Sequence, residues 1–334
     1  MELFHSFKKL HALTLAFLFL FAGLFGIGAA DAQDTATADQ GGVILTIPPQ
    51  PEWPEPSWDT GSSLTYKISV GHQTGSFNLK TRIAILGSEV VAGETLYWIE
   101  FDITDITGLS QCRQCGTPLK RGSRFCDACG APVAEDQEFF IQNYGEIPTS
   151  IRVKLELPRE NLIDIVLDPS GFYHRITTPG YVESLVFQYN RQVPLDVDPA
   201  LIGGWILPLG ALMMLEGNLP DDFYDNRNIG VEVLQDSELY STETSESSVT
   251  VESGSFEGSE FVYTSIDESA GNGTIFYSDR LSILPILMIN ANWAAPSRKT
   301  VEVELIASQE SGAQSQIVGQ PAPFNLQTLM SMGM

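Results

Sequence analysis

The sequence is poor in basic residues and in histidine. Lys and Arg together number 18 against 42 Asp and Glu, so the formal net charge at pH 7 is −24. An acidic surface of this size repels phosphate backbones and anionic lipid headgroups, which argues against nucleic acid as a partner. The chain also lacks a glycine-rich phosphate loop, and neither His72 nor His174 lies in a nucleophile motif. We therefore expect a binding protein, with a hydrolase or a thiol-redox enzyme as the lesser alternatives.

The N-terminus has the pattern of a targeting segment. Lys8 and Lys9 precede an apolar run that extends from Leu13 to about Ala30, and a small-x-small site follows at Ala30-Asp31-Ala32. This order is typical of a secretory signal peptide. The sequence predicts cleavage after residue 32 and export to the periplasm or the extracellular space. An uncleaved anchor is the alternative, and it would be the chain's only membrane contact.

Composition divides the rest of the chain. A proline-rich linker is expected over 33–60, a discontinuous β-rich domain over 61–108 and 136–308, and a flexible tail over 309–334. Residues 109–135, which contain all four cysteines, interrupt the β-rich domain as an insertion.

The periodicity of the β-rich domain is mostly two. Apolar residues alternate with polar ones at Leu64–Val70, Tyr97–Ile103 and Ile151–Leu157, and turn sequences separate further short runs. Glu100 and Asp102 alternate on one face of their strand, the pattern of a solvent-facing side. The predicted fold is mainly β: a curved antiparallel sheet or partly closed barrel, with one or two packed helices and the inserted cysteine module.

One segment departs from this pattern. Asp198-Pro199 resembles a helix start, Gly217 would end the helix, and the residues between are apolar nearly all round. A core helix packed on the sheet is one interpretation, and a lid over an apolar cavity is another. In the second case the cavity-lining candidates are Trp205, Leu207, Leu209, Met213 and Met214.

The cysteines form two CxxC pairs, Cys112/Cys115 and Cys126/Cys129, separated by ten residues. Four thiolates from two such knuckles satisfy tetrahedral zinc and leave no open position for water, so the zinc would be structural. Disulfides are the alternative in an oxidising compartment, and redox catalysis is a third. The stretch 111–134 resembles the short zinc-ribbon family, and this resemblance implies that the four cysteines bind one zinc ion.

Phe125, with Leu119 and Val133, is the expected small core of this ribbon. The ribbon also concentrates cations on an acidic chain, which suggests a surface for an acidic protein partner, although the cations also offset the zinc–thiolate charge. The candidate partner-binding residues are Arg113, Lys120, Arg121 and Arg124.

The β-rich body, over about residues 60–310, is similar to proteins of the lipoprotein-carrier (LolA/LolB-like) superfamily. Two features carry the resemblance. One is an aromatic-Ser-Asp step that leads into an apolar Leu-Pro segment, at Ile275–Ile286. The other is the order of the strands around it, at Leu64–Tyr66, Tyr97–Trp98, Gly254–Phe256, Phe261–Tyr263 and Val301–Ile306. The resemblance implies a sheet around an apolar cavity that accepts an acyl chain or a lipoprotein. Two functions are thus expected: an apolar-ligand carrier, or a scaffold that docks a protein partner through its ribbon.

Overall fold

The fold is seen in a computed structural model of the chain, which describes residues 43–47, 51–72, 75–107, 112, 114–115, 117, 119, 123–133, 151–158, 184–189, 195–197, 231–235, 240–266, 271–292 and 300–323. Every regular element in these ranges is a strand. None of them is a helix that could cross a membrane. The expected apolar helix, with all five cavity-lining candidates, lies outside the described residues, as do the signal segment and the residues from 324 onward.

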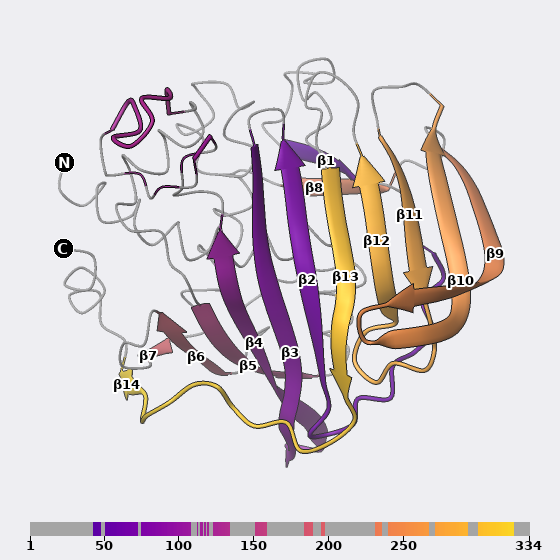
Figure 1. Ribbon diagram of the computed structural model, residues 1–334. Helices are drawn as coiled ribbons and strands as arrows, with labels where there is room; N and C mark the ends of the chain where they lie inside the picture. Colours follow the sequence, from indigo (N-terminus) through magenta and orange to yellow (C-terminus); the bar gives the residue numbers. More distant parts are fainter. Residues whose placement is uncertain are drawn as a thin grey trace.

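A single twelve-stranded sheet dominates the structure (Figure 1). Its two edge strands, β14 and β9, do not pair, so the sheet is curved but not closed. The mainly β fold with an open curved sheet is therefore confirmed. In spatial order the strands are β14 (Ala322–Pro323), β7 (Leu195–Val197), β6 (Ser184–Tyr189), β5 (Ile151–Pro158), β4 (Glu94–Thr107), β3 (Gly75–Val91), β2 (Ser63–His72), β13 (Thr300–Gln309), β12 (Ile286–Asn292), β11 (Asn272–Tyr277), β10 (Gly254–Ser265) and β9 (Tyr240–Val251).

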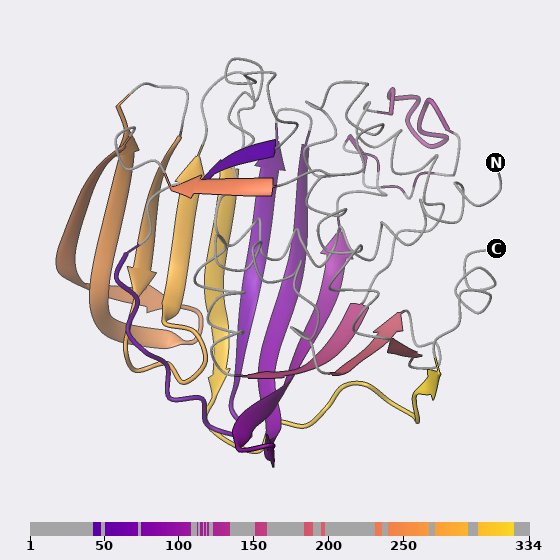
Figure 2. The same ribbon diagram turned by 180° about the vertical axis from the view of Figure 1, so that it is seen from behind.

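All pairs in this sheet are antiparallel except β14 with β7. A small parallel pair, β1 (Val43–Ile47) with β8 (Val231–Gln235), lies in front of the large sheet in Figure 2. The ribbon residues fall between β4 and β5, which pair directly with each other. The ribbon is thus an insertion between neighbouring strands, and the sheet continues past it without a gap.

One face of the sheet is apolar because the strands alternate in register. Tyr66 on β2 lies opposite Leu305 on β13 and Thr81 on β3, and the same face continues through Ile103 on β4. These side chains are fully buried. Tyr66 also donates a hydrogen bond of 2.9 Å to the carbonyl of Ile286, which ties β2 to β12 across β13.

The opposite face is polar, and part of it is covered. Lys67 faces Lys80 and Glu304 on this side, and Arg82 faces Asp102. The sequence predicted a solvent-facing side for Glu100 and Asp102, and this prediction is wrong. Glu100 is fully buried because the chain that follows β13 crosses over it, with the N–H of Gln316 donating to its carboxylate. Asp102 is 8% exposed and lies 2.9 Å from the Arg152 guanidinium. Local alternation cannot reveal a cover supplied from more than 200 residues away.

The end of the proline-rich linker packs on the body. Trp58 is buried, and its backbone N–H donates to the carbonyl of Ser282 at 2.8 Å. The Trp53 ring contacts Tyr277 edge-on, with centroids 5.6 Å apart. Residues 51–60 of the predicted linker are thus attached to the sheet by their aromatic residues, whereas residues 43–47 of the same segment form β1.

Candidate metal centre

The two knuckles of the ribbon are shaped by backbone hydrogen bonds. The N–H of Cys112 donates to the carbonyl of Thr117, and the N–H of Cys126 donates to that of Ala131, each at 2.8 Å. Each bond turns the chain back behind a cysteine, so that both thiols of a knuckle face one point. Gly130 follows the second knuckle with φ of 72°, a conformation that glycine adopts without steric cost.

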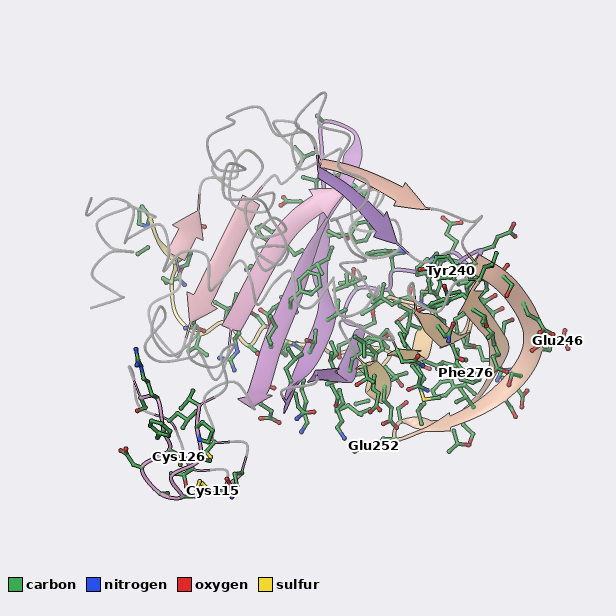
Figure 3. All side chains as sticks on the ribbon, turned by 90° about the horizontal axis from the view of Figure 1, so that it is seen from above. Cys115, Cys126, Tyr240, Glu246, Glu252 and Phe276 are labelled. Atoms are coloured by element: carbon green, nitrogen blue, oxygen red, sulfur yellow. The ribbon has the colours of Figure 1, made fainter. Side chains whose placement is uncertain are left out.

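The four thiols converge on one point. Cys112 Sγ lies 3.5 Å from Cys129 Sγ, Cys115 Sγ lies 3.5 Å from Cys126 Sγ, and all four sulfurs are within 4.8 Å of one another. Tetrahedral zinc with bonds of about 2.3 Å requires sulfur separations of about 3.8 Å. The geometry therefore fits one zinc ion, and all four cysteines are free thiols. Figure 3 shows Cys115 and Cys126 together in the ribbon, far from Glu246 on β9.

The thiols differ in acidity because of their neighbours. Hydrogen bonding with the side chain and backbone of Thr117 lowers the pKa of Cys115 to about 6. The backbone N–H of Ala131 acts to lower the pKa of Cys129, but hydrogen bonds with the other thiols and desolvation outweigh it and raise the pKa to about 12. Four adjacent thiolates repel one another, so a divalent cation at their centre is what allows all four to lose their protons.

The ribbon's small core differs from the expected one. Leu119 and Val133 are partly buried, but Phe125 is 61% exposed. Phe125 pairs with Pro132 through a β-bridge, and the N–H of Val133 donates to the carbonyl of Arg124 at 2.9 Å. This short hairpin turns the Phe125 ring outward, so its predicted core position is wrong. The sequence offers no signal for this, because both faces of so short a hairpin contain apolar residues.

Of the four candidate cations, Arg124 lies beside Phe125 and is exposed. The other three, Arg113, Lys120 and Arg121, lie outside the described residues. The structure thus places one predicted partner-binding residue next to an exposed aromatic ring that the sequence had assigned to the core of the ribbon.

One comparison with known proteins supports the ribbon. Residues 111–133 match the family described as zinc-ribbon domain. No curated protein matches the chain. The chain therefore contains a zinc-ribbon domain, whose four cysteines are positioned to bind one structural zinc ion.

Three solved structures are similar to the chain at low identity. A candidate exported protein with a YmcC-like fold from Bacteroides fragilis is 9% identical, with 77% of this chain and 99% of that chain covered and a TM-score of 0.27. A candidate lipoprotein from Parabacteroides distasonis is 10% identical, covering 78% and 100%, with a TM-score of 0.26. A hypothetical protein from Chlamydia trachomatis is 9% identical, covering 79% and 93%, with a TM-score of 0.28. These TM-scores are too low to support an argument, and the lipoprotein-carrier resemblance stays a prediction.

Proposed function

We propose that the chain is an exported binding protein, not an enzyme, and that its zinc ribbon is the docking module for an acidic protein partner. Export rests on the signal-like pattern of residues 1–32. The absence of catalysis at the ribbon follows from its chemistry, since four thiolates fill the tetrahedral shell of zinc and leave no position for a substrate. What the ribbon offers to another molecule is its surface.

The exposed ring of Phe125 is the observation that carries this proposal. An aromatic side chain held outward by a β-bridge, beside an exposed Arg124, has the composition of a protein-binding hot spot. The knuckle fixes the backbone before any partner arrives, so little entropy is lost when a partner covers the ring. The ribbon, residues 109–135, has four cations against two carboxylates, Asp127 and Glu135, which favours an acidic partner.

A labelled peptide rich in Glu and Leu, followed by fluorescence anisotropy, tests this docking. We expect Phe125→Ala to weaken binding roughly 10- to 30-fold, since loss of a hot-spot aromatic costs about 2 kcal/mol. Arg124→Glu should weaken it further at low salt, and zinc chelation should abolish it. The matched control is Ile266→Ala, which removes an apolar side chain of similar exposure directly after β10. Equal affinities for the wild type and Phe125→Ala, or binding that survives chelation, would refute the docking role.

The second candidate function is the carriage of an apolar ligand. It is favoured by the continuous apolar face of an open curved sheet, which runs from β4 to β12. The candidate cavity residues, from Trp205 to Met214, lie outside the described residues. Displacement of a fluorescent acyl probe by fatty acid tests this function. If the chain carries an apolar ligand, Trp205→Ala should weaken probe binding without lowering the unfolding temperature. A loss of stability with no separate loss of binding would contradict this function and make Trp205 an ordinary core residue.

A further inference from the structure

The chain after β13 forms a strap, residues 310–321, that crosses the polar face of the sheet toward β14. In Figure 1 it is the yellow segment in front of the lower ends of the strands, and in Figure 2 it passes behind them. It starts where two glycines meet: a Cβ on Gly61 would lie 3.0 Å from the backbone nitrogen of Gly312. The N–H of Ala313 then donates to the carbonyl of Gly61 at 2.8 Å.

Three side chains of the sheet hold the strap, and nearly all their contacts are to its main chain. Arg82 on β3 donates to the carbonyl of Gln314 at 3.0 Å. Glu100 on β4 accepts from the N–H of Gln316 at 2.6 Å and stays 3.5 Å from the Arg82 guanidinium.

Farther along, Gln188 on β6 contacts one residue twice. Its side-chain amide accepts from the N–H of Val318 at 3.2 Å and donates to the carbonyl of Val318 at 3.1 Å. This pattern imitates the pairing of a neighbouring strand, although the strap runs across the strands. The row Arg82, Glu100 and Gln188 thus binds an extended backbone at three successive points.

The strap contributes few side chains of its own to this contact. Ala313 is buried and Ile317 is partly buried, whereas Val318 is 75% exposed. One strap side chain, that of Ser315, also bonds to the row, with its hydroxyl donating to Glu100. Because little apolar area is buried, attachment depends on hydrogen bonds to a preformed row. Such segments open locally without unfolding the sheet.

We propose that Arg82, Glu100 and Gln188 form a binding site for an extended peptide with a hydroxyl residue opposite Glu100, and that residues 313–318 of the chain occupy this site in cis. The strap is then an internal ligand that an incoming peptide replaces. This site lies on the sheet, so it is independent of the ribbon and of the function proposed above.

The test weakens the strap without altering the row. Gln316→Pro removes the N–H that Glu100 accepts, while Arg82, Glu100 and Gln188 stay intact. The probe is a fluorescein-labelled peptide with the sequence of residues 311–320, added to the full chain and followed by anisotropy. Because a bound strap reduces the competent fraction of the site, Gln316→Pro should bind the probe about tenfold or more tightly than the wild type. The matched control is Gln320→Ala, an exposed strap position outside these contacts.

Two further arms locate the binding. Adding Glu100→Gln to the Gln316→Pro chain should reduce probe affinity at least fivefold, and a probe with Val in place of Ser315 should bind more weakly as well. Equal probe affinity for wild type and Gln316→Pro would overturn the proposal, as would binding that ignores the change at Glu100. Hydrogen exchange on the wild type gives an answer even if the variant fails to fold. The amides of Gln316 and Val318 should exchange at least tenfold faster than that of Ile68 on β2, and equal rates would contradict a detachable strap.

Discussion

The buried hydroxyl of Tyr66 gives the most quantitative prediction. Tyr66→Phe removes the hydrogen bond to the carbonyl of Ile286 and leaves the ring in place, so the free energy of unfolding at pH 7 should fall by about 1–2 kcal/mol. At high pH we expect this difference in stability to disappear. Burial raises the pKa of Tyr66 above its ordinary value of 10.0, so the folded state resists ionisation while the unfolded chain ionises freely.

The sign of this effect follows from linkage. A group whose folded pKa is raised contributes stability below its unfolded pKa and loses it as the pH rises toward the folded value. One unit above the unfolded pKa, near pH 11, the wild type should have lost about 1.4 kcal/mol that Tyr66→Phe does not lose. The two proteins should then be nearly equal in stability. Burial also raises the pKa of Tyr263, but Tyr263 is present in both proteins, so its effect cancels from the difference in stability.

Urea unfolding followed by tryptophan fluorescence at pH 7, 10 and 11 measures this difference. Tyr277→Phe, on a partly buried ring of β11, serves as the control, and its stability at pH 7 should change by less than about 0.5 kcal/mol. If Tyr66→Phe remains less stable than the wild type by the same amount at all three pH values, the buried environment assigned to Tyr66 is wrong.

Three other substitutions test the sheet. Gly273→Ala places a methyl 2.3 Å from the Tyr263 ring and should cost about 1–3 kcal/mol in urea unfolding, where an unchanged midpoint would contradict this packing. Glu100→Gln turns a charge-assisted bond into a neutral one, so exchange of the Gln316 amide should accelerate about tenfold; an unchanged rate would exclude Glu100 as the clamp. Burial raises the pKa of Asp102, so the wild type should lose stability relative to Asp102→Asn as the pH rises from 4 to 7, and a constant difference would argue against that burial.

The sequence predicted the alternating strands well and the less regular ones poorly. Leu64–Val70, Tyr97–Ile103 and Ile151–Leu157 all fall in strands. Alternation does not mark β3, the longest strand among the described residues at 17 residues, or β12. Part of β3 reads Ile83-Ala84-Ile85-Leu86, where alternation is lost because Ala84, opposite Glu100, is buried as well. Strands covered on both faces lose the period-two signal.

The tail shows a different limit. Its Gln, Ser and Gly content predicts a flexible segment from residue 309, yet residues 310–323 form the strap and β14. Composition measures how much apolar surface a segment can bury, and the strap buries little. The main chain of the strap is positioned by hydrogen bonds to Arg82, Glu100 and Gln188. Almost any residue type can make such main-chain bonds, so they do not show in the composition of the segment.

The metal site was the most predictable part of the molecule. Structural zinc needs four ligands at fixed separations, and the CxxC spacing of Cys112/Cys115 and Cys126/Cys129 is a local feature that the sequence records directly. The orientation of Phe125 was not predictable, because both faces of so short a hairpin contain apolar residues and nothing in the spacing says which face points outward.

Metal content with thiol titration, on the protein purified from the exported fraction, tests the central claim most directly. The account predicts about one zinc per chain, bound by Cys112, Cys115, Cys126 and Cys129, and four reactive thiols that appear only after chelation and denaturation. A chain without zinc and without free thiols would contradict it. The four cysteines would then be paired as disulfides, and the surface that presents Phe125 would no longer depend on a metal.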